Sequence, residues 1–282
     1  MEVAKPITFR QAREFSEIVN ITFSFIRQNF LHLGKCILFI VGPLILLDSI
    51  LFARWYQQAL TFESNPDLSS FYTGYFFNLL FGAVTFTILA AVIYEYIALY
   101  MEKGRETFEV GEVLRAVLRD LGKFVVAVIL GGLAVIAGYF LCVLPGIYLG
   151  IAFSLALVIV ALEQKDGFAA LSRSKDLITG NWWQTFGLIL VIAVIQMALS
   201  MVFYVPFYVI LVIIGLNSAD PEMMQSSLHS YLLFLTMAIM VGAYLLHTLQ
   251  VVAIAFQYFN LVERKEGTGL LQEIEQIGGE PA

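Results

Sequence analysis

The sequence is short of charged residues. Aspartate, glutamate, lysine and arginine make up 13% of its 282 residues, whereas soluble domains carry about 25%. Apolar residues make up 60%, and the mean hydropathy is +0.83. These values exclude an ordinary soluble domain and predict an integral membrane protein.

Histidine and cysteine are also scarce. His32, His229 and His247 are the only histidines, and Cys36 and Cys142 are the only cysteines. The two cysteines fall near opposite membrane faces in the topology given below, so they cannot form a disulfide within one chain. With so few ligands of this kind, we expect no metal site and no cofactor.

The motifs of common enzyme classes are absent as well. The sequence has no P-loop, no His-Glu-x-x-His, no Cys-x-x-Cys and no Gly-x-Ser-x-Gly. No basic stripe interleaved with aromatic residues points to nucleic acid. We therefore expect a protein that is not an enzyme, with no catalytic residue and no nucleic-acid partner.

Long apolar runs are what the sequence does have, and a membrane helix needs about 20 such residues. The predicted spans are at about residues 33–56, 75–101, 124–144, 147–162, 183–215 and 231–262. Every lysine and arginine except Arg54 then falls on one side of the membrane. The positive-inside rule puts that side, with both termini, in the cytoplasm. We expect one six-span domain over residues 1–265 and a flexible acidic tail at 266–282.

Three further segments carry apolar residues at helical spacing, with polar residues on the other side. They lie at about residues 10–30, 107–121 and 167–179. We expect amphipathic helices that lie on the cytoplasmic membrane surface. Candidate headgroup contacts are Arg115, Arg119, Arg173, Lys175, Trp182 and Trp183. The ordinary alternative is that the basic residues form a solvated face beside the spans.

Local signals predict where some of these helices begin and end. Asp166 is a suitable N-cap for the third amphipathic helix, and Gly180 a suitable C-terminal cap. Gly122 is expected to close the second amphipathic helix. Pro145-Gly146 is expected to form the turn of a tight hairpin between spans three and four.

Two acids, Asp48 and Glu95, fall inside predicted spans. Such a group costs about 2.5 kcal/mol or more at a helix centre unless it is paired, and it therefore marks a functional site by default. Glu95 has Gln250, Gln257 and Asn260 of the last span as candidate partners. Asp48, Glu95, Gln250 and Gln257 form the candidate intramembrane polar site. The alternative for both acids is a buried hydrogen bond that locks two helices together.

Three motifs carry a resemblance to a known family. They are LPGIY at residues 144–148, the acid Glu163, and AALSRSKDLITGNWW at residues 169–183. Together they resemble a broad family of bacterial six-span membrane proteins of unknown function, related to the membrane domain of some glycerophosphoryl diester phosphodiesterases. The stretch YEYIALYMEKGR at residues 94–105 looks like the version found in Bacteroidetes-type bacteria. In that family the phosphodiesterase chemistry belongs to a separate soluble domain, so the resemblance carries over no catalytic residue.

The sequence thus predicts an all-α, six-span protein of a bacterial inner membrane, with three cytoplasmic amphipathic helices. The leading hypothesis is a non-enzymatic protein that binds membrane lipids, or a membrane or cytoplasmic protein partner, in envelope processes. The alternative is a small-solute or lipid transporter that uses Asp48 or Glu95. The oligomeric state is left open by the sequence.

Overall fold

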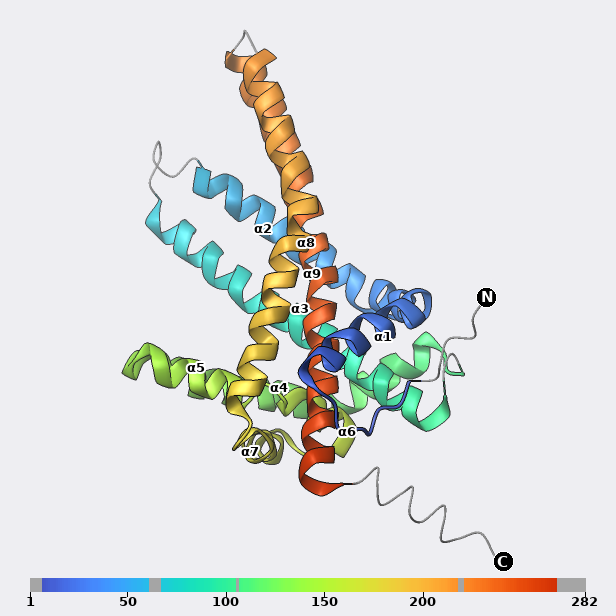
Figure 1. Ribbon diagram of the computed structural model, residues 1–282. Coiled ribbons are helices and arrows are strands. Elements are labelled where there is room, and N and C mark those ends of the chain that lie inside the picture. Colours follow the sequence, from blue (N-terminus) through green and yellow to red (C-terminus); the bar gives the residue numbers. More distant parts are fainter. Residues whose placement is uncertain (1–6, 61–66, 105–106, 218–220, 268–282) are drawn as a thin grey trace, which may run out of the picture. The chain divides into compact units, whose positions relative to one another are not determined.

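The computed structural model describes residues 7–60, 67–104, 107–217 and 221–267. These ranges are helical apart from short connections, and they contain no strand (Figure 1). A helix satisfies its own backbone hydrogen bonds, which is the requirement that an apolar environment imposes on such a sequence. The all-helical prediction is confirmed for these residues.

Nine α-helices and one π-helical turn follow one another along the described chain. They are α1 (Phe15–Cys36), η1 (Ile37–Val41, the π-helical turn), α2 (Gly42–Leu60), α3 (Leu68–Lys103), α4 (Val110–Leu141), α5 (Val143–Ala152), α6 (Ala156–Glu163), α7 (Gly167–Ile178), α8 (Trp182–Asn217) and α9 (Pro221–Glu266). Within the described residues, six helical stretches are long and apolar enough to cross a membrane. This number is the one that the sequence predicts.

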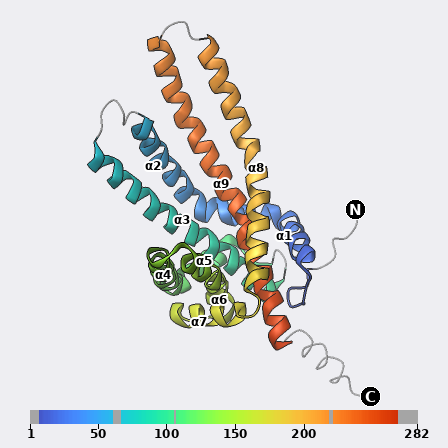
Figure 2. The same ribbon diagram turned by 60° about the vertical axis from the view of Figure 1, so that its left-hand side comes forward.

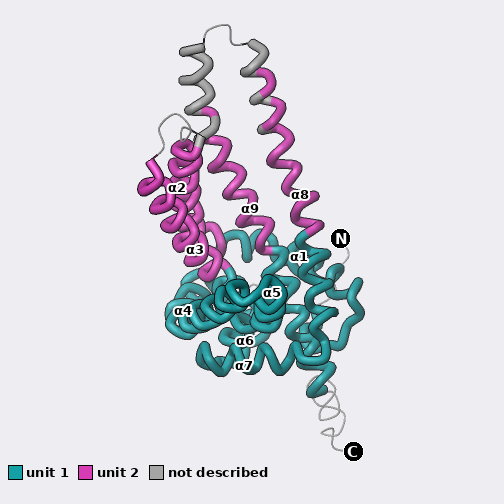
Figure 3. Tube along the Cα trace, turned by 90° about the vertical axis from the view of Figure 1, so that its left-hand side faces the viewer, with its two compact units in different colours: residues 1–36, 90–193, 249–282 teal, residues 37–89, 194–248 magenta. Residues whose placement is uncertain are grey.

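The chain divides into two compact units (Figure 3). Unit 1 comprises Met1–Cys36, Ala90–Ala193 and Leu249–Ala282, and unit 2 comprises Ile37–Leu89 and Val194–Thr248. Large side chains that are fully buried in unit 1 include Phe25, Tyr96, Phe124 and Phe256. Buried residues of unit 2 include Val41, Ile45, Ala53 and Leu89.

The three predicted amphipathic segments bury their apolar stripes inside unit 1. The stripes comprise Ile18, Phe25 and Leu33 of α1, Val113, Val117 and Phe124 of α4, and Ala170, Leu171, Leu177 and Ile178 of α7. Helix α7 packs on α4, α5 and α6. Phe168, near the start of α7, is 71% exposed. Each segment therefore has a buried face, but the predicted stripes are only partly buried, because Phe23, Phe30, Leu114 and Leu118, which were predicted on them, are exposed.

Helix α4 corrects two predicted boundaries. It continues through Gly122, because its apolar stripe extends beyond that residue and one glycine costs a helix only about 1 kcal/mol. It ends at Leu141, and the extended backbone of the next residue, Cys142, makes the turn before α5, so the turn does not lie at Pro145-Gly146. Cys142 is exposed, whereas Cys36 is buried.

Helices α4 and α5 lie side by side as a hairpin (Figures 1 and 2). A Cβ added at Gly138 would lie 2.9 Å from the backbone nitrogen of Gly146. The two glycines therefore let the backbones of α4 and α5 meet directly. The predicted fourth span is interrupted at residues 153–155, between α5 and α6.

Helix α7 has the predicted caps. The Asp166 carboxylate accepts hydrogen bonds from the backbone N–H groups of Phe168 and Ala169, both at 3.0 Å. Gly180 follows the helix with a φ of +86°, a conformation that glycine adopts without a Cβ clash. Helix α8 is continuous through Pro206. The predicted acidic tail lies outside the described residues from position 268 onward.

Candidate functional site

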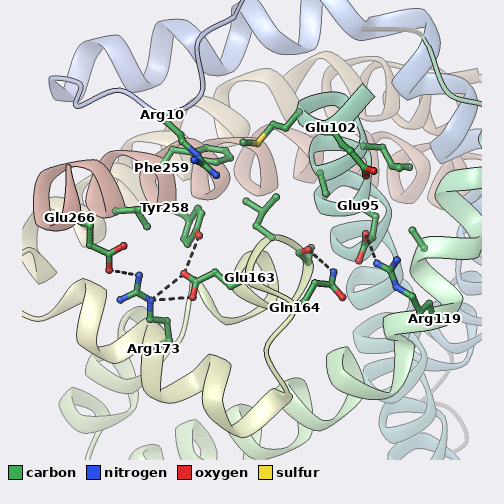
Figure 4. A pocket seen from close by; sticks show the side chains of 17 residues that line it. Arg10, Glu95, Glu102, Arg119, Glu163, Gln164, Arg173, Tyr258, Phe259 and Glu266 are labelled. Atoms are coloured by element: carbon green, nitrogen blue, oxygen red, sulfur yellow. Dashed lines mark hydrogen bonds and ion pairs between the residues drawn. The ribbon is translucent and has the colours of Figure 1, made fainter. Parts of the chain in front are cut away.

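Unit 1 contains a charged cleft of about 810 Å³, which we call the unit 1 cleft (Figure 4). The segment before α1, the ends of α3, α6 and α9, and the sides of α4 and α7 form it. Its charged lining residues are Arg10, Glu95, Glu102, Arg119, Glu163, Arg173 and Glu266. Its volume lies in the range of about 300–1,000 Å³ that is usual for small-molecule sites. Three sequence candidates, Glu95, Arg119 and Arg173, are thus brought to one place.

One wall of the unit 1 cleft is an ion-pair network between α6, α7 and α9. Arg173 Nε donates to the two carboxylate oxygens of Glu163 at 3.1 and 3.3 Å, and its Nη2 donates to Glu266 Oε1 at 2.5 Å. The hydroxyl of Tyr258 donates to Glu163 Oε1 at 3.0 Å. Glu163 therefore accepts hydrogen bonds from two different helices.

The network keeps Arg173 charged. Burial acts to lower the pKa of Arg173, but its hydrogen bonds with Glu266 and Glu163 outweigh burial and raise this pKa above its ordinary value. The side chain of Arg173 is 22% exposed. Arg173 is therefore a fixed positive charge whose main hydrogen bonds are made within the protein.

The opposite wall is built around two buried acids, Glu95 of α3 and Asp120 of α4. Arg119 donates to Asp120 Oδ2 from Nε at 2.9 Å and from Nη2 at 2.6 Å, and Lys123 Nζ lies 2.6 Å from Asp120 Oδ1. Arg119 Nη2 lies 3.8 Å from Glu95 Oε2. The side chain of Arg119 is 60% exposed, so it remains open to a ligand.

Glu95 lacks a full set of partners. Its Oε1 is buried and has no hydrogen-bond partner among the described residues. A buried acceptor of this kind is costly unless a further donor is supplied. Glu95 also lines the unit 1 cleft, so this unsatisfied acceptor lies beside the space that a ligand would fill.

Two of the partners predicted for Glu95 bind elsewhere. Gln257 Nε2 donates to Thr185 Oγ1 at 3.0 Å, and Asn260 Nδ2 donates to Gln257 Oε1 at 3.4 Å. Gln250 and Gln257 do not line the unit 1 cleft. The intramembrane polar site predicted from the sequence is therefore not one cluster.

Arg10 lines the cleft because neighbouring residues on both sides of it in the sequence are held against α9. The Phe9 ring stacks on the Phe256 ring with centroids 5.9 Å apart. The backbone N–H of Arg13 donates to Asn260 Oδ1 at 2.9 Å. Burial lowers the pKa of Arg13, and Glu17 opposes this effect. Arg10, between Phe9 and Arg13, is exposed and has no ion pair within the described residues.

Unit 2 has its own cleft, of about 430 Å³, which we call the unit 2 cleft. Asp48 of α2 lines it and is 2% exposed. Asp48 Oδ2 accepts a hydrogen bond from the hydroxyl of Tyr244 in α9 at 2.5 Å. His247, one turn further along α9, also lines this cleft.

The other candidate headgroup residues lie outside both clefts. Arg115 and Lys175 are exposed on α4 and α7, and Trp183 is 77% exposed. Trp182 donates from Nε1 to the backbone oxygen of Tyr148 at 3.2 Å and stacks on Phe186. Of the tryptophan pair, Trp183 alone is therefore fully open at the surface.

Sequence reasoning missed Asp120, Arg10 and Tyr258. Asp120 had a usable signal, because it falls on the apolar stripe that Val117 and Phe124 continue. An acid on a buried stripe needs partners, and Arg119 and Lys123 are adjacent. Arg10 and Tyr258 had no such signal, since only the packing of unit 1 brings them to Glu163 and Glu95.

In the part of the chain that the structure describes, no three His, Cys, Asp or Glu side chains are grouped so that they could hold a metal ion. A family model described as a domain of unknown function (DUF7847) matches residues 68–261. The chain belongs to this family. No curated protein and no solved structure matches the chain. The DUF7847 region contains Glu95, Arg119, Glu163, Arg173 and Tyr258, whereas Arg10, Asp48 and Glu266 lie outside it.

Proposed function

We propose that this DUF7847 protein is a non-enzymatic, multi-pass protein of a bacterial inner membrane that binds a lipid headgroup in the unit 1 cleft. The six long apolar helices support the membrane location. The position of every lysine and arginine but Arg54 on one side supports cytoplasmic termini. The polar ends of α3, α6 and α9 then lie at the cytoplasmic membrane surface, where headgroups are available.

The observation that carries this proposal is the mixed charge of the cleft. Arg10 and Arg119 are exposed cations that suit a phosphate, since arginine presents several donors to its oxygens. The unpartnered Oε1 of Glu95 suits a primary ammonium. A zwitterionic headgroup such as phosphoethanolamine combines both groups, and it fits this lining better than a simple anion does.

The four basic headgroup candidates fall into two groups, whose effects on lipid binding can be compared by mutation. Arg119 and Arg173 line the cleft, whereas Arg115 and Lys175 do not. Short-chain phosphatidylethanolamine is titrated into the purified full chain in detergent, and binding is measured by calorimetry. We expect Arg119→Gln to weaken binding by about tenfold, the effect of one charge-assisted contact worth about 1.4 kcal/mol.

Arg115→Gln is the matched control, because it removes an exposed charge from the same helix. We expect it to bind phosphatidylethanolamine as the wild type does. Equal losses in Arg115→Gln and Arg119→Gln would mean that general surface charge attracts the lipid, and the cleft proposal would then be wrong. Phosphatidylcholine, whose quaternary ammonium cannot donate to Glu95, should bind more weakly than phosphatidylethanolamine.

A transporter is the second candidate, because Asp48 and Glu95 each line a cleft. Solute and lipid flux is measured in reconstituted vesicles with wild type, Asp48→Asn and Glu95→Gln. Flux that depends on either acid supports transport. A folded wild-type protein that binds lipid and shows no flux contradicts it.

The resemblance to the membrane domain of glycerophosphoryl diester phosphodiesterases stays a prediction, and a headgroup site agrees with it. A membrane or cytoplasmic protein partner is a further prediction. We propose that α1, the first turns of α4, and α7 lie at the cytoplasmic surface. Their apolar faces are partly covered within unit 1, so lipid contact there rests on polar groups and on exposed apolar side chains such as Phe30, Leu118 and Phe168.

A further inference from the structure

We propose that the unit 2 cleft binds a hydrophobic organic monocation, meaning an amine, quaternary ammonium or phosphonium group that carries apolar substituents. Asp48 is the counter-charge, and aromatic rings supply most of the remaining contact. The proposal does not depend on the headgroup site, because the two clefts share no lining residue.

The carboxylate of Asp48 is buried without a cation beside it. Asp48 is 2% exposed, and its hydrogen-bond partner, the Tyr244 hydroxyl at 2.5 Å, is a neutral donor. No salt bridge joins Asp48 to a lysine or arginine in the described parts of the chain. Arg54, the single lysine or arginine in the sequence of unit 2, does not line the cleft. A buried carboxylate is stabilised by a cation, and here a ligand can bring it.

Aromatic side chains make up much of the lining of the unit 2 cleft. Phe52, Trp55, Tyr75 and Phe86 all line the cleft. The Trp55 ring lies 5.6 Å from Tyr75 and 5.7 Å from Phe52, tilted by 42° and 49°. Trp55 Nε1 donates to the backbone oxygen of Phe71 at 3.3 Å, so its polar atom is occupied and its ring face is left for contact. Aromatic faces attract cations, and most strongly in a site without water.

Gly82 leaves the carboxylate of Asp48 accessible from the cleft. A Cβ at Gly82 would lie 3.8 Å from Asp48 Oδ2 and 3.8 Å from the Tyr244 hydroxyl. An alanine methyl fits at that distance, but a longer side chain would cover both oxygens. Gly82 lines the cleft, so its missing side chain opens the carboxylate to an occupant.

The rest of the lining sets the class of ligand. Leu79, Ala83, Met240 and Ala243 are apolar, Asn78 and His247 add two polar side chains, and no lysine or arginine lines the cleft. A volume of about 430 Å³ suits a small molecule. A compact cation with apolar groups matches such a lining, whereas an anion or a strongly hydrated ion such as Na⁺ does not.

Equilibrium dialysis of the purified full chain against radiolabelled tetraphenylphosphonium tests the proposal. Tetraphenylborate has nearly the same shape and the opposite charge, so it separates charge recognition from partition into apolar surface. We expect one saturable tetraphenylphosphonium site per chain, with no competition from tetraphenylborate. Competition by tetraphenylborate equal to that by unlabelled tetraphenylphosphonium would overturn the proposal.

Three variants locate the site. Asp48→Asn should weaken tetraphenylphosphonium binding by about tenfold or more, as the loss of a buried counter-charge predicts. Asp67→Asn removes an exposed carboxylate of the same unit, which does not line the cleft, and should bind as the wild type does. Tyr244→Phe keeps Asp48 and removes its neutral donor, so it should bind at least as well as the wild type.

Gly82→Leu keeps the proposal falsifiable if Asp48→Asn fails to fold. It leaves the carboxylate in place and fills the space in front of it, so binding should be lost while the thermal unfolding midpoint stays near that of the wild type. Wild-type affinity in folded Gly82→Leu or folded Asp48→Asn would place the cation elsewhere and overturn the proposal.

Discussion

At the scale of single residues, Ser174 joins three helices of unit 1. Its hydroxyl donates to the backbone oxygen of Ala152 at 2.7 Å and accepts from the backbone N–H of Leu155 at 3.2 Å. These two groups lie at the interruption between α5 and α6, where the helix leaves backbone groups without partners. Ser174 is fully buried, so water cannot replace it.

We therefore expect Ser174→Ala to destabilise the protein by about 1–3 kcal/mol, because it leaves two buried backbone groups unsatisfied. Ser172→Ala, an exposed serine on the same helix, should change stability by less than about 0.5 kcal/mol. Unfolding in mixed micelles measures both values. Equal stabilities for the two variants would show that the Ser174 hydrogen bonds are not needed.

Arg173 stabilises unit 1 through the residues with which it forms ion pairs. Its removal leaves Glu163, which is 18% exposed, with the Tyr258 hydroxyl and the outer Lys165 as partners. We expect Arg173→Gln to lower the free energy of unfolding by about 2 kcal/mol, the usual size for a half-buried charged hydrogen-bond pair.

Lys175→Gln is the control for Arg173→Gln, since Lys175 is exposed on the same helix. The double variant Arg173→Gln/Glu163→Gln should recover part of the loss, because it removes the unpaired charge together with its partner. A double variant whose loss is the sum of the two single losses would show that the pair is not coupled.

The sequence predicted which charges matter better than it predicted their partners. Asp48 and Glu95 stand out because an acid within an apolar run is rare. The partner of Glu95 depends on which helix lies beside α3 in unit 1, and no local pattern encodes that choice. Gln257 was one of three candidate partners, with Gln250 and Asn260, but its amide donates to Thr185 instead.

At the scale of elements, Gly138 and Gly132 of α4 form a matched pair. A Cβ at Gly138 would meet the backbone of Gly146 at 2.9 Å, whereas nothing lies within 4 Å of a Cβ at Gly132. Gly138→Ala should separate α4 from α5 and cost at least about 1–3 kcal/mol. Gly132→Ala should be neutral or stabilise the helix by up to about 1 kcal/mol. Thermal unfolding of both variants checks the difference, and a Gly138→Ala protein as stable as Gly132→Ala would contradict the close contact.

The elements also show where sequence patterns mislead. Gly122 was expected to end a helix, but α4 continues because Phe124 and Ala127 extend the stripe of Val117. The caps of α7 were predicted correctly because Asp166 and Gly180 act on their own backbone neighbours. Patterns that act locally are readable in a sequence, whereas the interruption at residues 153–155 depends on Ser174, about 20 positions away.

At the scale of the whole molecule, the uneven distribution of lysine and arginine predicts which side of the membrane each segment faces. Ser69, at the start of α3, and Thr179, after α7, are both exposed. On a Cys142→Ala background, Ser69→Cys should react with an impermeant maleimide in intact spheroplasts. Thr179→Cys should react only after permeabilisation, because its side carries the basic residues. The reverse pattern would invert the topology, and the cytoplasmic position of the unit 1 cleft would then be wrong.

The most direct test of the headgroup proposal is to locate a bound lipid. Phosphatidylethanolamine with a photoreactive group close to its headgroup is incorporated into vesicles with the full chain, and mass spectrometry identifies the crosslinked peptides. We predict crosslinks at residues that line the unit 1 cleft, such as Glu102, Gln164 and Phe259, and their loss in Arg119→Gln. Crosslinks spread over exposed apolar residues such as Phe140 and Leu141, with none in the cleft, would contradict the account.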